Sequence, residues 1–165
     1  MKIPDLPEGL VGDEKSVELI RMILQESPFP FSRQQFSPGH VTATGLVLHG
    51  RLKRWLLPGG HVEPEMDGDI RESAAREVLE ETGVSVIGGR IVGADVHGIP
   101  AKVREGVELE PYHLHHDVLV WFQSNEIELT LSEESSDLRW VWPTEFDAYS
   151  VPANVRRAYA RVVAR

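Results

Sequence analysis

Hydrophobic side chains recur every three or four residues near both ends of the chain. Near the N-terminus, the segment DEKSVELIRMILQES carries its apolar residues at helical spacing: Val17, Ile20, Ile23 and Leu24. Near the C-terminus, NVRRAYARVVAR carries them at i, i+3, i+4, i+7 and i+8: Val155, Ala158, Tyr159, Val162 and Val163. Because this spacing places apolar residues on one face of a helix, it predicts an amphipathic helix in each segment.

The middle of the chain has the pattern of strands. VTATGLVLHG (41–50) is rich in β-branched residues and ends in a turn-prone His-Gly pair, and HLHHDVLVWFQ (113–123) is a strong strand candidate. Further β-rich segments are VSVIGGRIVGADVHGI (84–99) and LRWVWP (138–143). RWLL (54–57) predicts a short strand that runs into a Pro-Gly-Gly loop. Helices and strands are mixed, so the predicted fold class is α/β or α+β.

A third helix is predicted from Ile70 to Thr82. Asp69 is a suitable N-cap, and Glu72 follows three residues later as its capping-box partner. Gly83 stands where a glycine commonly ends a helix. The side of the helix away from its glutamates should pack against the domain through small and apolar residues: Ala74, Ala75, Val78 and Leu79.

Composition narrows the class of protein. The 165 residues are 41% hydrophobic and 26% charged, which fits a single globular domain. There is no cysteine, which excludes disulfides, thiolate zinc sites and cysteine nucleophiles. The sequence has no apolar run of about 20 residues and no secretory signal pattern, so we expect a cytoplasmic protein without a membrane partner.

The net charge of −9 limits the kinds of molecule that the protein is expected to bind. An acidic surface repels phosphate backbones, so broad nucleic-acid binding is not expected. A small phosphorylated ligand is compatible with this charge if a metal cation lies between the two negative partners. The sequence leaves a homodimer open.

The segment REVLEETGV concentrates acidic residues on one helical turn, with Glu77, Glu80 and Glu81 at i, i+3 and i+4. Like-charge pairs at this spacing each cost roughly 0.2–0.5 kcal/mol, and most acidic clusters are simply solvated. Here a Pro-Gly-Gly loop lies just upstream and brings backbone carbonyls close to the helix. Carboxylate and carbonyl oxygens together suit a hard divalent cation such as Mg²⁺.

These residues resemble the Nudix box, G-x5-E-x7-R-E-U-x-E-E-x-G-U, in which U is aliphatic. The second half of the box matches in register: Arg76, Glu77, Val78, Glu80, Glu81, Gly83 and Val84. The first half departs from it, because 15 residues (61–75) separate Gly60 from Arg76 where the pattern has 13. Neither Met66 nor Gly68, at the counted positions, is the expected glutamate. A two-residue loop insertion explains the spacing, and four acids lie nearby: Glu63, Glu65, Asp67 and Asp69.

The resemblance runs from about residue 40 to residue 146 and implies a fold. That fold is an α/β/α sandwich with a mixed sheet between helices. We assign residues 36–165 to the Nudix domain and residues 1–35 to a helical extension packed on it. In the family, the first glutamate of the box mainly supports the loop and helix geometry, so the insertion bears more on the shape of the loop than on the chemistry.

The resemblance also implies roles for single residues. Glu77, Glu80 and Glu81 are the expected metal ligands, joined by the backbone carbonyl of Gly60, and the expected cofactor is Mg²⁺ or Mn²⁺. Arg76 matches the arginine that orients a glutamate through a charge-assisted hydrogen bond. In many family members an acid from a later loop completes the catalytic site. The best match for that acid is Glu134, with its neighbour Glu133 as the rival.

The histidine-rich strand YHLHHDVLVWF offers a second group of candidates. A period of two places His113, His115 and Asp117 on one face of the strand. His115-x-Asp117 is also the local part of a two-histidine, one-carboxylate iron site, which would favour a β-sandwich oxygenase. Such a fold has no use for the box helix. In a Nudix-like fold the strand passes near the cleft, so these three residues are candidates for contact with substrate, or else polar side chains of a half-exposed strand.

We predict a Nudix pyrophosphohydrolase that cleaves the pyrophosphate linkage of a nucleoside diphosphate joined to another moiety. A metal-activated water would attack phosphorus, and Glu80 or Glu134 would accept its proton. The alternative is a non-catalytic Nudix-fold module that binds a nucleotide and regulates another process. An isoprenoid-diphosphate isomerase shares the fold but needs a cysteine. Pro100 lies near where ADP-ribose-cleaving relatives carry a proline, which leaves the substrate open.

Overall fold

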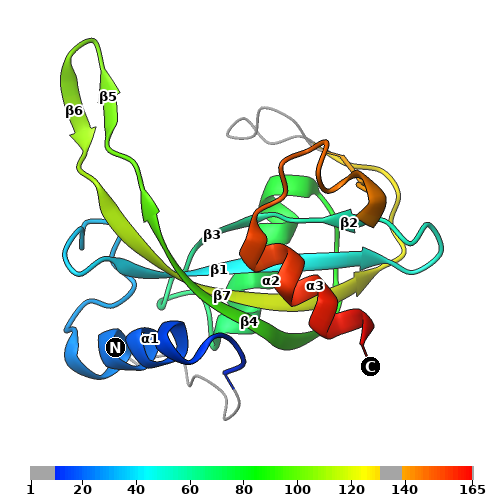
Figure 1. The fold of residues 1–165 in the computed structure, drawn as a ribbon, viewed down its shortest axis with the longest axis horizontal. Coiled ribbons are helices and arrows are strands. Elements are labelled where there is room, and N and C mark those ends of the chain that lie inside the picture. Colours follow the sequence, from blue (N-terminus) through cyan, green and yellow to red (C-terminus); the bar gives the residue numbers. More distant parts are fainter. Residues whose placement is uncertain (1–9, 131–138, 165) are drawn as a thin grey trace.

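The structure, a computed structural model, describes residues 10–130 and 139–164. Its helices are α1 (Glu14–Glu26), α2 (Ile70–Thr82), α3 (Ala153–Val163) and the short 3₁₀ helix η1 (Pro143–Glu145). Its strands are β1 (His40–His49), β2 (Trp55–Leu56), β3 (Gly59–His61), β4 (Ile87–Ile99), β5 (Lys102–Arg104), β6 (Val107–Glu110) and β7 (His113–Ser124). Figure 1 shows α2 and α3 on opposite sides of a central sheet.

The central sheet is mixed. Its strand order is β2-β1-β7-β4, and β3 also pairs with β1. β1 and β7 run parallel, with His40 opposite His115 and Thr42 opposite Asp117, while the other pairs are antiparallel. The parallel pair brings the starts of β1 and β7 together at one end of the sheet, beside the glycines of β3.

Each face of the sheet has its own apolar core. One core joins α1 and α2 to the sheet through residues such as Ile20, Ala74 and Val78. The other joins α3 to the opposite face and includes Val155 and Ala158. This is the expected α/β/α sandwich, and it excludes the all-β sandwich that an iron oxygenase would require. Because α1 contributes buried residues to the first core, this helix packs as part of the body.

The box helix α2 begins and ends where the sequence predicts. The side chain of Asp69 caps it by accepting hydrogen bonds from the amides of Arg71 and Glu72, and Gly83 ends it in the left-handed conformation at φ 71°. The capping box differs from the expected one, because the carboxylate of Glu72 accepts from the amide of Gly68. The packed face also differs: Leu79 is 51% exposed.

Two other segments differ from the prediction. LRWVWP is not a strand: within its described residues only Val141 forms a β-bridge, to Trp55, and Trp142 leads directly into η1. The stretch between Ile99 and His113 forms a hairpin of β5 and β6 that the sequence analysis did not identify. Figure 1 shows this hairpin projecting from the body. No described helix is long and apolar enough to cross a membrane.

Candidate functional site

A polar cavity of about 350 Å³ lies where β3 and α2 meet the parallel strands β1 and β7. Its walls carry acids, imidazoles and hydroxyls from elements far apart in sequence: Arg33, Thr42, Thr44, Gly59, Gly60, His61, Glu77, Glu81, His97, His115 and Asp117. Two of the three predicted box glutamates are therefore on the cavity wall, together with two of the three residues predicted on the histidine strand.

The glycines of β3 let the backbone approach the box helix closely. A Cβ atom added to Gly60 would overlap the carboxylate of Glu77, so any side chain at this position would displace that carboxylate. The amide of Gly59 donates a hydrogen bond of 3.2 Å to Oε2 of Glu81. The Gly-Gly pair thus brings the backbone close to two carboxylates of α2, and the group that contacts Glu81 is an amide, whereas the sequence analysis expected carbonyls.

Arg76 connects the carboxylates beside the cavity. Its Nη1 donates to Oε1 of Glu77 at 3.0 Å and to Oε2 of Glu80 at 2.9 Å. Its Nε and Nη2 donate to the two oxygens of Asp67, and Nη2 also donates to the carbonyl of His61. The hydrogen bonds that Arg76 donates to Asp67, the largest influence, raise the pKa of Arg76 against the opposing effect of burial, so the guanidinium is charged at every pH of interest.

Asp67 is a structural acid that the sequence analysis placed only among four neighbours. It is buried and accepts from Arg76, from the hydroxyl of Ser73 and from the amide of Glu63. Burial would raise the pKa of Asp67, but together these hydrogen bonds lower it by a larger amount. The net pKa therefore lies below the ordinary aspartate value. Its place between the two counted positions for the missing glutamate, Met66 and Gly68, is the signal that could have identified it.

The three box glutamates have different surroundings. Glu77 is 7% exposed, and burial raises the pKa of its carboxyl despite the partner Arg76. Glu81 lines the cavity, whereas the side chain of Glu80 is 54% exposed and lies outside the lining, held by Arg76. Arg76 is one cation shared among Asp67, Glu77 and Glu80.

This donor set fits a hard divalent cation. The carboxylates of Glu77 and Glu81 and the backbone of Gly60 converge on one cavity, and the negative charge there exceeds what the shared Arg76 offsets. Buried carboxylates in such excess favour neutralisation by a cation or a proton. Hard oxygen donors select Mg²⁺ or Mn²⁺ over softer metals.

Asp117 is a further acid that lines the cavity. It is buried at the β1–β7 seam, where Oδ1 accepts from the hydroxyls of Thr42 at 3.1 Å and Thr44 at 3.0 Å. Burial raises the pKa of its carboxyl, and the two threonine bonds oppose that rise. Both threonines lie in the strand that the sequence predicts at residues 41–50. Nothing in their spacing indicated that they would bond to Asp117.

The histidine strand meets further histidines that the sequence analysis did not connect with it. His115 lines the cavity, but His113 is buried and lies outside the lining. Both are packed with His40 from the start of β1, and His61 from β3 stacks on His40 with ring centroids 5.1 Å apart. The pairing of β1 with β7 brings these rings together, and only the topology shows it. Glu134 and its rival Glu133 lie outside the described residues.

The comparisons with known proteins agree with this geometry. Residues 37–165 match the family model of the NUDIX domain. A MutT protein from Methanosarcina mazei Go1 is 23% identical, with a TM-score of 0.53 over 77% of this chain and 94% of that one. The NUDIX domain of Shewanella oneidensis NrtR, solved with ADP ribose, is 16% identical, with a TM-score of 0.52 over 83% of this chain and 98% of that one.

A NUDIX hydrolase from Nitrosomonas europaea is 20% identical, with a TM-score of 0.51 over 76% of this chain and 89% of that one. At these identities the solved structures establish the fold, and the family match covers most of the chain, including α2 with its box residues. The chain therefore belongs to the Nudix family, as its sequence predicted.

Proposed function

We propose that this protein hydrolyses the pyrophosphate linkage of a nucleoside diphosphate joined to another moiety, using Mg²⁺ or Mn²⁺. The observation that carries the proposal is the convergence of Glu77, Glu81 and the Gly60 backbone on one polar cavity. A cavity with this lining suits a charged, hydrated ligand better than an apolar one. A phosphate chain bridged by a divalent cation meets that requirement.

The ligands proposed for the cation are Glu77, Glu81 and the backbone carbonyl of Gly60. Glu80 joins them when its exposed side chain turns away from Arg76. The bound ion supplies charge stabilisation on the transferring phosphoryl group and lowers the pKa of a water molecule. Arg76 orients Glu77 and Glu80 through charge-assisted hydrogen bonds.

The remaining residues bind substrate and move a proton. Arg33 is a cationic side chain on the cavity wall and is suited to a phosphate oxygen. His115 and Asp117 line the same cavity and can donate or accept hydrogen bonds with the second moiety. The proton of the attacking water goes to Glu80, or to Glu134 from the later loop.

The choice of substrates to test follows from the comparisons. The S. oneidensis NUDIX domain was solved with ADP ribose, and that nucleotide has the pyrophosphate linkage proposed here. ADP-ribose therefore belongs in the panel beside nucleotide sugars, dinucleoside polyphosphates and nucleoside triphosphates. A non-catalytic nucleotide-binding regulator is the alternative function, since the same cavity could hold a nucleotide without cleaving it.

The test is turnover of this panel with Mg²⁺ and with Mn²⁺, comparing the wild type with Glu80→Gln and Glu81→Gln. Loss of a glutamate that accepts the proton should lower the rate by roughly 10²–10⁴-fold. Glu108→Gln on the exposed hairpin is the matched control and should keep full activity. Tight nucleotide binding without turnover of any panel member would instead favour the regulatory module.

A further inference from the structure

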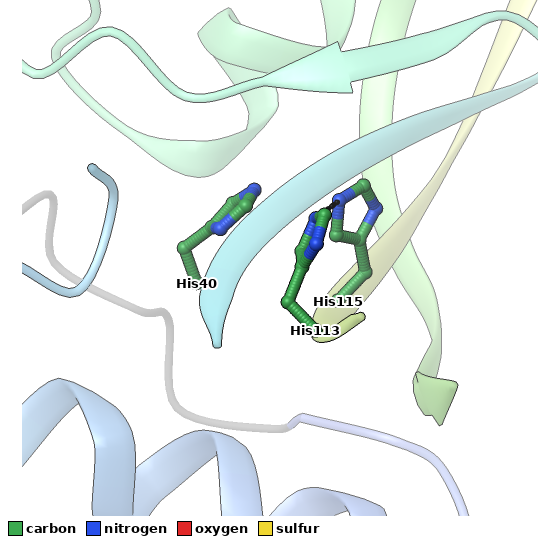
Figure 2. A group of neighbouring side chains, drawn as sticks. All are labelled: His40, His113 and His115. Carbon is green, nitrogen blue, oxygen red and sulfur yellow. Dashed lines mark hydrogen bonds between the residues drawn. The ribbon is translucent and has the colours of Figure 1, made fainter. Parts of the chain in front are cut away.

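Three imidazoles converge at the end of the sheet where β1 and β7 begin. One ring nitrogen from each of His40, His113 and His115 lies within 4.8 Å of a ring nitrogen from the other two. Figure 2 shows the three rings together, with His113 and His115 joined by a hydrogen bond. The strand register explains the meeting: His40 pairs directly with His115, and His113 lies two residues away on the same face.

The backbone fixes the proton on two of these rings. Nδ1 of His113 lies 2.9 Å from the carbonyl oxygen of Pro111, and Nδ1 of His40 lies 3.4 Å from that of Gln35. A carbonyl oxygen only accepts hydrogen bonds, so Nδ1 carries the proton in both rings. In the neutral ring, Nε2 then has a free lone pair. Backbone carbonyls that hold the far nitrogen in this way are typical partners of metal-binding histidines.

Nε2 of His113 has His115 as its partner, whereas Nε2 of His40 has none among the described residues. That nitrogen of His40 is buried, and His40 itself is 1% exposed. A buried nitrogen left without a partner costs free energy that a ligand would recover. Burial lowers the pKa of His40, and it lowers the pKa of His115 to about 3. Neutral imidazole is the form that binds a metal.

The one short separation between these ring nitrogens fits a tetrahedral ion. Nε2 of His113 and Nε2 of His115 are 3.3 Å apart. Two nitrogens bound to one tetrahedral zinc at about 2.0–2.1 Å lie about 3.3–3.4 Å from each other. Imidazole donors favour zinc and its first-row neighbours, whereas the carboxylates of α2 favour Mg²⁺.

We propose that His40, His113 and His115 form a second metal site, which binds Zn²⁺ or a similar first-row divalent cation. His115 also lines the polar cavity, so the ion lies at the cavity edge, where water or a phosphate oxygen can complete its coordination. The buried acid Asp117 on the same wall gives charge compensation. This proposal is independent of the hydrolase activity, because it needs only the three rings and their carbonyl partners.

The test is direct metal binding to the full chain after treatment with a chelator. Isothermal titration with Zn²⁺, in a large excess of Mg²⁺ that occupies the carboxylates, should give one equivalent bound. His113→Gln and His115→Gln should each weaken this binding at least roughly tenfold. His116→Gln is the matched control, since His116 lies on the same strand but bonds to the Pro38 carbonyl instead of joining the cluster, and should bind Zn²⁺ as the wild type does.

Two further measurements separate the histidines from the box. Glu77→Gln should leave the Zn²⁺ equivalent intact, whereas binding lost in Glu77→Gln and kept in His113→Gln would overturn the proposal. Co²⁺ bound to the wild type should give the strong visible absorption of a tetrahedral nitrogen-ligated ion. Its absence from the wild type would overturn the site whether or not the variants fold. None of these readings depends on turnover, so failure of the hydrolase proposal would leave them unchanged.

Discussion

Arg76 donates two hydrogen bonds of 3.1 Å to the carboxylate of Asp67, from Nε to Oδ1 and from Nη2 to Oδ2. This bidentate pair ties α2 to the loop that precedes it, within the stretch where two additional residues change the spacing of the box. In the family that the box resembles, the first glutamate supports the same geometry. Asp67 supports it here, from a buried position.

Asp67→Asn should therefore destabilise the fold. Removing one partner of a buried pair commonly costs 3–5 kcal/mol, and we expect about 3 kcal/mol, because Arg76 keeps Glu77 and Glu80 as partners. Urea unfolding measures the change. Glu65→Gln, an exposed acid in the same loop, should stay within about 0.5 kcal/mol of the wild type. Equal stability of Asp67→Asn and the wild type would show that the pair is not needed for the loop.

The contribution of Asp67 should also depend on pH. Its pKa in the folded state is below the ordinary aspartate value, because the hydrogen bonds it accepts outweigh burial. A carboxyl with a lowered folded pKa stabilises the protein fully above its unfolded pKa and loses that effect as the pH falls through the folded pKa. The stability gap between the wild type and Asp67→Asn should therefore be constant from pH 7 to about pH 5 and shrink below about pH 4. A gap that widens at low pH would contradict this sign.

Local signals in the sequence were enough to predict the box helix. Asp69 and Gly83 mark its ends, and both act there as expected. The C-terminal helix also follows from periodicity, whereas the mixed sheet was expected from the family resemblance. The prediction failed where a residue's partner is distant. LRWVWP has strand composition, but among its described residues, 139–143, only Val141 pairs with a strand. The β5–β6 hairpin was missed because its strands have only three and four residues, too few for their alternation of apolar and polar residues to stand out.

The site was predictable only in part, for the same reason. The box spacing identifies Glu77, Glu81 and Gly60, since these lie within one short segment and converge on the cavity. His40 is more than 70 residues from His113, and only the parallel pairing of β1 with β7 brings them together. A search for histidines at the starts of two predicted strands would have suggested that they cluster. It would not have shown which residues of the two strands lie opposite each other.

Gly60→Ala should disturb the site through Glu77 alone. The added Cβ would overlap the carboxylate of Glu77, and overpacking of this kind costs about 1–3 kcal/mol. In a Glu77→Ala background the obstacle is gone, so the same substitution should cost much less. A double-mutant cycle by urea unfolding measures this coupling. If Gly60→Ala costs the same in both backgrounds, the close approach of Gly60 to Glu77 does not determine the choice of glycine.

Divalent metal should reverse the effect of Glu77 on stability. Burial raises the pKa of Glu77 in the metal-free protein, so its ionised form is disfavoured in the folded state at pH 7. Glu77→Gln, which is neutral and of similar shape, should therefore be at least as stable as the wild type without metal. Mg²⁺ at a hundred times its dissociation constant should then stabilise the wild type by about 2.7 kcal/mol and stabilise Glu77→Gln much less.

Thermal and urea unfolding with and without Mg²⁺ measure both effects in one experiment. Glu108→Gln on the hairpin is the control, and its Mg²⁺ response should equal that of the wild type. If Glu77→Gln lost stability without metal and kept the full Mg²⁺ response, Glu77 would act only as the partner of Arg76. We therefore expect Glu77→Gln to be at least as stable as the wild type without Mg²⁺ and less stable than the wild type with it. This reversal is expected only if the buried carboxylate binds a cation, because a purely structural acid would favour the folded state under both conditions.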